Sequence, residues 1–202
     1  MGNQRQGIQR IGLFGGTFDP IHVGHLIVAD EIRMRCALEK VVFVPAAQPP
    51  HKRSACVASA EARAAMVSLG IRGHPCFELS AAELDRKGPS YTVDTLRQFR
   101  QEWGRQAEIF FIMGNDNVPE IAEWKSPEEI VRLCTIVVAS RPGATTKPID
   151  SALARQMRFV PVPLIEVSSS DIRRRIRCGE PYRFLVPLPV AAYIRRHGLY
   201  RS

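Results

Sequence analysis

The sequence predicts an α/β fold: a Rossmann-like, doubly wound and mostly parallel sheet, completed by C-terminal helices. Short β-branched or aromatic runs alternate with longer helical stretches along the 202-residue chain, as in successive β-α-β units. The strand runs, such as VVFV, IFFIM and TIVVA, are apolar throughout, which is typical of strands covered by helices on both faces. The length suits one domain spanning residues 1–202, with residues 1–7 as a flexible extension before the first strand.

The element boundaries follow from these runs and from capping residues. The expected strands occupy residues 8–14, 40–45, 76–80, 108–113, 135–140 and 158–164. The expected helices occupy residues 25–38, 59–71, 92–103, 127–133, 152–156, 169–178 and 189–196. Ser126 before Pro127, with Glu129 two residues after the proline, predicts a capping box. Gly179 and Gly198 are expected to terminate the last two helices.

The composition argues against a membrane protein and a secreted one. Hydrophobic residues make up 45% of the chain and charged residues 24%, as in ordinary soluble domains. No apolar run approaches the roughly 18 residues of a membrane span. The start, MGNQRQGIQR, lacks the apolar core of a signal peptide, so a cytoplasmic location is expected. The formal net charge of +8 favours an anionic partner, either nucleic acid or a small phosphorylated substrate, unless it only marks a solvated basic face.

The stretch GLFGGTFDPIHVGH places two glycines at the end of the first apolar run. Ligands bind beyond the carboxyl ends of strands in open parallel sheets, and Gly15 and Gly16 let the backbone approach a bulky anion there. The next helix begins near His22 to His25, and its free N–H groups and positive dipole end favour phosphate. The two histidines are three residues apart, so both imidazoles are expected to point the same way. Thr17 adds a hydroxyl donor.

This constellation suits phosphoryl or nucleotidyl transfer, because fixed donors can meet the charge that develops on phosphate oxygens. Two alternatives stay open on these residues alone. Glycine pairs also mark ordinary turns. A His-x-x-His pair can ligate a metal, although no third ligand with suitable spacing is evident. We therefore expect no metal site built from protein side chains.

Three later segments have a chemical and a purely structural interpretation. Pro49-Pro50-His51-Lys52 would form a stiff loop over an anion, or a solvated turn. Ser90 or Thr92, in GPSYTVDTL, can cap the helix that follows. Gly114 ends a strand and admits a ligand there, while Trp124 can stack on a pyridine ring or serve as a core aromatic.

The segment VSSSDIR begins the helix expected at residues 169–178. Its serines can cap that helix and donate hydrogen bonds to phosphate. Arg173 lies about one turn in, where a guanidinium can pair with phosphate oxygens in a bidentate manner. Arg174, Arg175 and Arg177 are expected to lie around the same helix as mostly solvated side chains.

These segments together resemble a known family. GGTFDPIHVGH is similar to the signature of the nucleotidylyltransferase superfamily, whose (H/T)xGH element is HVGH here. Within the superfamily, the chain is most similar to the bacterial nicotinate-nucleotide adenylyltransferases, because PPHK, SYTVDTL, GND with its downstream tryptophan, and VSSSDIR follow in the family's order. Asn115 fills a position that varies in the family and is often alanine. Val167 and Ser170 replace the family's isoleucine and threonine, and both keep the chemistry of the site.

The resemblance implies transfer of the adenylyl group from ATP to nicotinate mononucleotide, in NAD biosynthesis. The products would be nicotinate adenine dinucleotide (deamido-NAD) and pyrophosphate, with Mg²⁺ held mainly by the ATP phosphates. As catalytic residues it implies His22, His25 and Arg173. For the ATP phosphates it implies Gly15, Gly16, Thr17, Phe18, Lys52, Ser169 and Ser170. For the nicotinate nucleotide it implies Ser90, Tyr91, Thr92, Gly114, Asp116 and Trp124.

Both substrates would be small molecules, with no nucleic-acid or membrane partner, and a homo-oligomer is one option for the assembly. Two other functions are weighed against this one. A related enzyme could transfer AMP or CMP to another phosphate, such as phosphopantetheine, but SYTVDTL and GND with its tryptophan argue for a nicotinate nucleotide. A basic RNA-binding module would bind with a steep salt dependence, but both histidines and Arg173 are present, which favours an enzyme.

Overall fold

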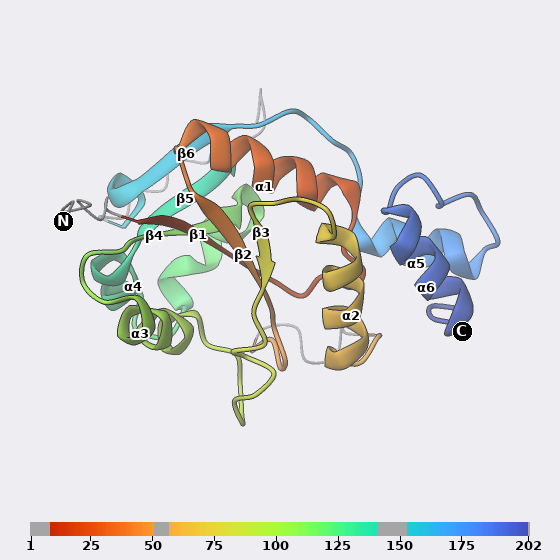
Figure 1. Cartoon of the computed structure of the whole chain (residues 1–202), viewed down its shortest axis with the longest axis horizontal. Coiled ribbons are helices and arrows are strands. Elements are labelled where there is room, and N and C mark those ends of the chain that lie inside the picture. Colours follow the sequence, from red (N-terminus) through yellow and green to blue (C-terminus); the bar gives the residue numbers. More distant parts are fainter. Residues whose placement is uncertain (1–8, 51–56, 141–152, 202) are drawn as a thin grey trace, which may run out of the picture.

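A computed structural model describes residues 9–50, 57–140 and 153–201, and the predicted extension at residues 1–7 lies outside them (Figure 1). Six strands form one sheet in the order β3-β2-β1-β4-β5-β6, and every neighbouring pair is parallel. This arrangement confirms the predicted doubly wound α/β class. The strands are β1 (Arg10–Gly16), β2 (Lys40–Pro45), β3 (Phe77–Leu79), β4 (Glu108–Gly114), β5 (Thr135–Ser140) and β6 (Met157–Pro161).

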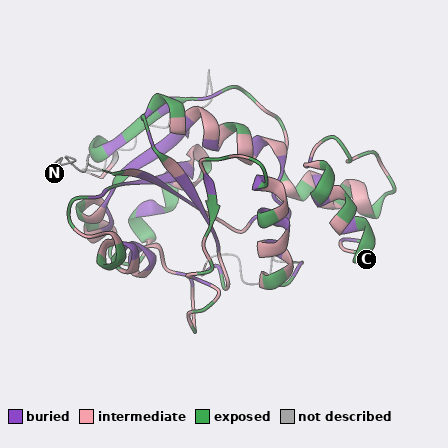
Figure 2. Ribbon diagram, in the orientation of Figure 1, coloured by how far each residue is buried: buried purple, intermediate pink, exposed green. Residues whose placement is uncertain are grey.

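Helices cover both faces of the sheet (Figure 1). One hydrophobic core joins the sheet to α1, α2, α5 and α6, and a second core joins its other face to α3, α4 and η1. The strands are accordingly buried along most of their length, apart from the edges of the sheet (Figure 2). The helices are α1 (Val23–Arg35), α2 (Ala60–Ile71), α3 (Thr92–Trp103), α4 (Pro127–Leu133), α5 (Ser169–Arg177) and α6 (Leu188–Arg196), with 3₁₀ helices η1 (Asn115–Glu123) and η2 (Ala154–Gln156).

The order of the strands places a switch point between β1 and β4. From β1 the chain winds to β2 and β3 on one side, and then returns to β4, β5 and β6 on the other. Leu13 in β1 pairs with Phe111 in β4, so these two strands end at the same edge of the sheet. In open α/β sheets this is where ligands bind, because the connections after the two strands run in opposite directions and leave a crevice.

Several predicted boundaries shift in the structure. The first strand ends two residues later than expected, because Gly15 and Gly16 still pair with β2. The predicted capping box at Ser126 is wrong: this residue has left-handed backbone angles (φ 53°, ψ 58°) and its side chain makes no capping hydrogen bond. Gly179 and Gly198 do follow their helices with φ of 67° and 62°, which confirms the predicted terminations.

The region around the last strand differs most from the prediction. Only a short 3₁₀ turn, η2, is described where a helix was expected at residues 152–156. The last strand ends at Pro161 rather than at residue 164, where its partner β5 also ends, and the Val162 N–H still donates to the Ser140 carbonyl. The helix η1 after β4 was not predicted at all, and it contains Pro119.

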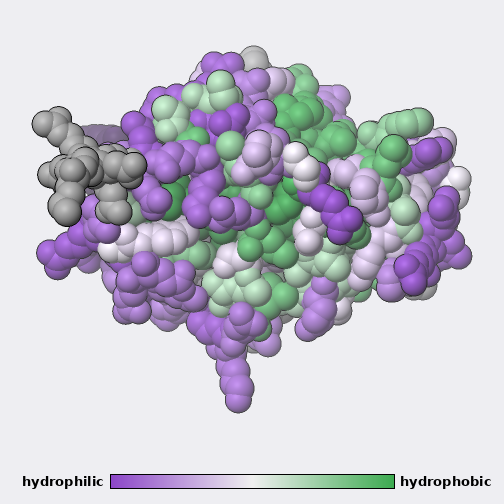
Figure 3. All heavy atoms as spheres, in the orientation of Figure 1, coloured by the Kyte–Doolittle hydropathy of each residue, from purple (hydrophilic) through white to green (hydrophobic). Residues whose placement is uncertain are grey.

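On the face shown in Figure 3, hydrophilic residues lie along much of the outline, and apolar residues reach the surface between them. Two large apolar side chains near the start of α6 are well exposed, Phe184 at 81% and Leu188 at 54%. Exposed apolar side chains of this size are often covered in an assembly, and a homo-oligomer stays a prediction for this protein. Within the described part of the chain, no helix is both long and apolar enough to cross a membrane.

Candidate active site

The loop between β1 and α1 starts at a stretch of backbone that has no room for side chains. A Cβ on Gly16 would lie 2.9 Å from the ring of Phe18, and one on Gly15 would lie 3.3 Å from the ring of Phe111. Phe18 itself is buried and takes a left-handed conformation, with φ of 50°. A side chain at Gly16 would force the Phe18 ring to move, and one at Gly15 would crowd Phe111, so the two glycines leave bare backbone at the carboxyl end of β1.

His22 and His25 form a stacked pair at the start of α1. His22 is the N-cap residue, and the two imidazole centroids lie 3.7 Å apart with an angle of 25° between the rings. The His22 backbone N–H donates a hydrogen bond to Nδ1 of His25, at 3.2 Å. A neutral imidazole that accepts at Nδ1 carries its proton on Nε2. His25 thus has one N–H donor in a defined position, and the prediction that both rings share one side is confirmed.

The surroundings of the pair keep both imidazoles neutral. Burial lowers the pKa of His22 to about 4. The pKa of His25 is also lowered, first by burial and then by the neighbouring His22. Nδ1 of His22 is buried and has no hydrogen-bond partner among the described residues. At neutral pH the pair therefore offers N–H donors rather than positive charge to an anion at the positive end of α1.

The stability of the protein is expected to fall in mild acid because of this pair. A histidine in the unfolded chain takes up a proton below about pH 6.5, whereas native His22 stays neutral down to about pH 4. Between these values the unfolded state binds more protons, so the contribution to stability is complete above pH 6.5 and decreases as the pH falls. For His22 the free energy of unfolding should drop by about 2 kcal/mol from pH 7.5 to pH 5.

Urea unfolding at the two pH values, with His22→Gln as the comparison, measures this contribution. Glutamine does not titrate, so the variant should lose distinctly less stability than the wild type over the same interval. An equal loss in both proteins would show that His22 is not held neutral in the native state.

Helix α5 brings the predicted phosphate-binding segment against the β1–α1 loop. Arg173 donates from Nη1 to the carbonyl oxygen of Asp19 at 2.8 Å, and Ser169 donates from Oγ to the carbonyl oxygen of Pro20 at 2.9 Å. These pairs are 154 and 149 residues apart in the sequence. The hydroxyl proton of Ser169 is engaged in this bond, so its expected donation to phosphate requires the hydroxyl to rotate. Ser170 is exposed, and its Oγ lies 3.4 Å from Nη2 of Arg173.

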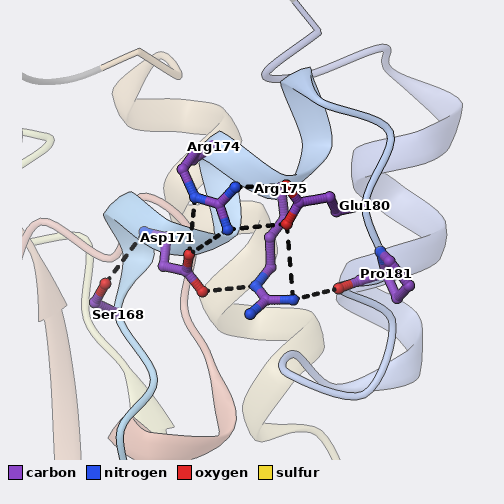
Figure 4. Close-up of polar contacts among 6 residues, drawn as sticks. All are labelled: Ser168, Asp171, Arg174, Arg175, Glu180 and Pro181. Atoms are coloured by element: carbon purple, nitrogen blue, oxygen red, sulfur yellow. Dashed lines mark hydrogen bonds and ion pairs between the residues drawn. The ribbon is translucent and has the colours of Figure 1, made fainter.

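Of the arginines expected to be mostly solvated, Arg174 and Arg177 are exposed and Arg175 is half-buried, and Arg174 and Arg175 also form ion pairs (Figure 4). Ser168 caps the helix by accepting from the N–H of Asp171, which confirms that a serine caps it. The Asp171 carboxylate then pairs with Arg174 at 2.9 Å and with Arg175 at 2.6 Å, and Arg174 also pairs with Glu180 at 2.6 Å. These exposed ion pairs tie α5 to the turn after it. They leave Arg173 as the arginine of α5 that contacts the β1–α1 loop.

The segment GPSYTVDTL joins the site through Ser90, although not as a helix cap. Tyr91 is the N-cap residue of α3, and no side chain makes a capping hydrogen bond there, so the predicted cap by Ser90 or Thr92 is wrong. Ser90 is buried and exchanges two hydrogen bonds with Gln48: its N–H donates to the Gln48 carbonyl, and its Oγ accepts from the Gln48 N–H. The segment is thereby attached to the chain just after β2.

Lys125 and Trp124 contact aromatic rings on the α3 side of the sheet. The ammonium of Lys125 lies 4.6 Å from the ring centroid of Tyr91 and pairs with Asp94 at 2.8 Å. The adjacent Trp124 packs edge-on against Phe111, with ring centroids 6.1 Å apart, and its Nε1 is buried with no partner among the described residues. Lys125 thus links Tyr91 to the segment that carries Trp124. The sequence offered no signal for this lysine, because a single exposed lysine is ordinary.

A buried carboxylate that the sequence analysis did not single out, Glu83, is hydrogen-bonded to the first turns of α3. Glu83 is buried and accepts from the Thr95 hydroxyl at 2.6 Å, and Arg86 donates to the same Thr95 oxygen at 3.0 Å. Burial raises the pKa of Glu83, while its hydrogen bonds with Thr95 and Ser90 act in the opposite direction. Glu83 thus stabilises the position of the segment that begins α3.

The remaining predicted residues are placed as follows. Gly114 ends β4, and a Cβ there would collide with the Asp116 carboxylate unless that side chain moved. Asp116 itself is exposed in η1, and Thr17 is half-buried. Lys52 lies outside the described residues. Within the described ranges, no group of three or more histidine, cysteine or acidic side chains is arranged to hold a metal ion.

Comparison with known proteins identifies the family of this chain. Residues 13–175 match the cytidylyltransferase-like family model. A Thermus thermophilus protein named "Probable nicotinate-nucleotide adenylyltransferase" is 47% identical over 194 residues, which cover 95% of this chain and all of the relative. A protein of the same name from Moorella thermoacetica is 42% identical over 199 residues, covering 95% of this chain and 92% of the relative.

Among solved structures, Plasmodium falciparum nicotinic acid mononucleotide adenylyltransferase complexed with NaAD has a TM-score of 0.74 to this chain. The identity is 20%, and the match covers 95% of this chain and 97% of the other, so it shows a shared fold.

The parallel sheet with a histidine pair at its switch point, together with these matches, defines a nucleotidyltransferase. The chain belongs to the cytidylyltransferase-like family and, within it, to the nicotinate-nucleotide adenylyltransferases.

Proposed function

We propose that this protein transfers the adenylyl group of ATP to nicotinate mononucleotide, forming nicotinate adenine dinucleotide and pyrophosphate in NAD biosynthesis. The observation that supports this most directly is the stacked, neutral histidine pair at the first turn of α1, beside the bare backbone that ends β1. Relatives of 42% and 47% identity over nearly the whole chain are named for this activity. The reaction takes place in the cytoplasm between two small molecules.

The reaction needs no covalent intermediate on the protein. A phosphate oxygen of the mononucleotide attacks the α-phosphorus of ATP. The bond from that phosphorus to the oxygen bridging to the β-phosphate breaks, and pyrophosphate leaves with the electron pair. The protein contributes by positioning the two phosphates in line and by stabilising the charge that develops on their oxygens.

The donors for this charge come from both ends of the chain. His25 offers its Nε2–H, and His22 lies stacked against it. The N-terminus of α1 adds partial positive charge, and Arg173 adds a full one from α5. A divalent cation, Mg²⁺, enters as part of the ATP substrate and neutralises the leaving pyrophosphate. We expect the ATP phosphates to supply most of its coordination.

The remaining roles follow the same division. The β1–α1 loop with Lys52, Ser169 and Ser170 holds the ATP phosphates, and the α3 side holds the mononucleotide. Tyr91 and Trp124 offer aromatic faces for the pyridine ring, and Trp124 also offers an unpartnered indole N–H. Ser90, Thr92, Gly114 and Asp116 line the same side.

Gly24 is expected to set the position of His22. A Cβ at this residue would lie 3.1 Å from Nδ1 and Cε1 of the His22 ring, so Gly24→Ala must shift the imidazole by a few tenths of an ångström. Misplacement on this scale should lower kcat about tenfold. The melting temperature should not fall, because alanine favours the helix by about 1 kcal/mol. Steady-state kinetics and thermal unfolding test both parts, and an unchanged kcat would contradict the role of this glycine.

Pyrophosphate release with ATP and Mg²⁺ tests the function itself, with nicotinate mononucleotide compared with nicotinamide mononucleotide. Release with the acid and little with the amide is the expected result. Equal release with both would support adenylyl transfer but show that the protein does not distinguish the carboxylate of the acid from the amide. Release only with phosphopantetheine would show that this compound, and not nicotinate mononucleotide, is the acceptor. No release with any acceptor, together with RNA binding that falls steeply with salt, would replace the function by RNA binding.

A further inference from the structure

A fully buried arginine lies under the β1–α1 loop. Arg63 projects from the first turn of α2 and is only 1% exposed. Its three nitrogens donate to three carbonyl oxygens: Nη1 to Thr17 at 2.7 Å, Nη2 to Ala47 at 3.2 Å and Nε to Ala58 at 3.3 Å. These carbonyls follow β1, follow β2 and precede α2. Arg63 therefore joins the two loops at the carboxyl edge of the sheet to one another.

The shortest of these bonds determines how the loop after β1 presents its backbone. In a planar trans peptide, the carbonyl and the following N–H point in opposite directions. Arg63 draws the Thr17 carbonyl inward, so the N–H of Phe18 points to the opposite side. The Gly16 carbonyl is likewise held, by the N–H of Ala46 at 2.9 Å, which turns the Thr17 N–H away from β2.

Two successive N–H groups are thus presented on one loop. No described residue accepts a hydrogen bond from the N–H of Thr17 or of Phe18. Phe18 has the left-handed conformation found in backbone concavities that bind anions. The loop is followed directly by the histidine pair at the N-terminus of α1, so these N–H groups extend the same row of donors.

Arg63 also carries a positive charge and makes no direct ion pair within the described residues, although the Glu61 carboxylate on the same helix attracts it. Within the described part of the chain, no carboxylate lies within ion-pair distance of it, and its described partners are carbonyl oxygens. A buried cation without a paired anion is costly on its own, and a bound phosphate nearby would offset that cost. The observations therefore favour a role in anion binding beyond packing.

We propose that Arg63 is a positioning residue of the ATP site: it turns the Thr17 carbonyl inward so that the Phe18 N–H faces the phosphates, and its buried charge favours them. This inference rests on the proposed adenylyl transfer for the identity of the anion. It predicts that loss of Arg63 raises the KM for ATP more than the KM for the mononucleotide. The reason is that Arg63 is hydrogen-bonded to the β1–α1 loop and not to the segment that begins α3.

The test is the change in each KM for Arg63→Lys and Arg63→Met. Lysine keeps the charge but cannot bond three carbonyls at once, and methionine removes both. The KM for ATP should rise about tenfold in Arg63→Lys and further in Arg63→Met, as expected when a hydrogen bond to a charged group is lost. The KM for nicotinate mononucleotide should change less than about twofold. Calorimetric titration with ATP alone should show the same loss of affinity.

Tyr200→Phe is the matched control for the same buried region. The Tyr200 hydroxyl donates to the Asp19 carboxylate at 2.6 Å, and Asp19 in turn accepts from the N–H groups of Val57 and Ala58. Removing this hydroxyl loosens the packing beside Arg63 without touching the Thr17 carbonyl. The KM for ATP of Tyr200→Phe should therefore stay within about twofold of the wild type. This should hold even if the melting temperature of Tyr200→Phe falls as much as that of Arg63→Lys.

Three results would overturn the inference. They are an equal rise of both KM values, an unchanged affinity for ATP, and loss of folding in both Arg63 variants, which would make the residue structural. A wild-type protein that binds ATP but forms no dinucleotide would instead refute the proposed function. The ATP titrations would still decide the role of Arg63 in that case.

Discussion

Replacing His25 by alanine is expected to lower kcat of adenylyl transfer by about 10²–10³, the usual effect of removing one donor that meets transition-state charge. The structure gives a physical reason. Nδ1 of His25 accepts from the His22 backbone N–H, so the neutral ring presents its proton on Nε2. Burial and the neighbouring His22 lower its pKa, so it acts as a fixed neutral donor. The KM for ATP should change much less than kcat, because the donor acts mainly on developing charge.

Pre-steady-state or steady-state measurement of pyrophosphate release provides the comparison, with His197→Ala as the control. His197 is exposed at the end of α6, far in sequence from the β1–α1 loop, and should leave kcat unchanged. Near-wild-type turnover in His25→Ala would contradict a catalytic role for this residue. A large effect in both variants would point to a general loss of structure.

Arg173→Ala is expected to lower kcat/KM by about 10²–10³, because a guanidinium that pairs with phosphate oxygens stabilises the charge of the transferring group. Nη1 of Arg173 is bonded to the Asp19 carbonyl, which holds the side chain against the β1–α1 loop. Arg173→Lys should recover only part of the activity, since a lysine cannot keep that bond and also make two parallel bonds to phosphate.

The same helix supplies a matched control in Arg177→Ala. Arg177 is exposed one turn further along α5, so its removal changes the net charge equally and should leave kcat/KM within about twofold. If both variants lose activity alike, the effect belongs to the overall positive charge of α5 and not to a placed guanidinium. Repeating the comparison at higher salt separates these cases, because long-range attraction is screened and direct contact is not.

Much of the fold and site could be predicted from local pattern. Apolar runs covered on both faces predicted a parallel sheet, and the structure confirms it with six parallel strands. The spacing of His22 and His25 predicted a shared side, which the stacked rings confirm. These predictions succeed because side-chain periodicity and the helix turn are local properties of the chain. Ser126 shows the limit even here, since its expected capping bond is replaced by a left-handed backbone.

The contacts that assemble the site lie beyond such patterns. Nothing near Ser169 or Arg173 in the sequence indicates that their partners are the carbonyls of Pro20 and Asp19, about 150 residues away. Ser90 could be predicted as a helix cap from its neighbours, yet it bonds to Gln48. A side chain with several acceptors in reach takes the one that packing brings closest, and packing is a property of the whole fold.

The sequence by itself determined the class of fold, the order of most strands and helices along the chain, the glycine-rich stretch with its two histidines at the start of α1, and the family. Only the tertiary structure decided the order of the strands in the sheet, the contacts of α5 with the β1–α1 loop and the burial of Arg63 under that loop. The physical reason is the range of the interactions. Local backbone preferences are written in consecutive residues, whereas burial and hydrogen-bond partners depend on which distant segments the folded chain brings together.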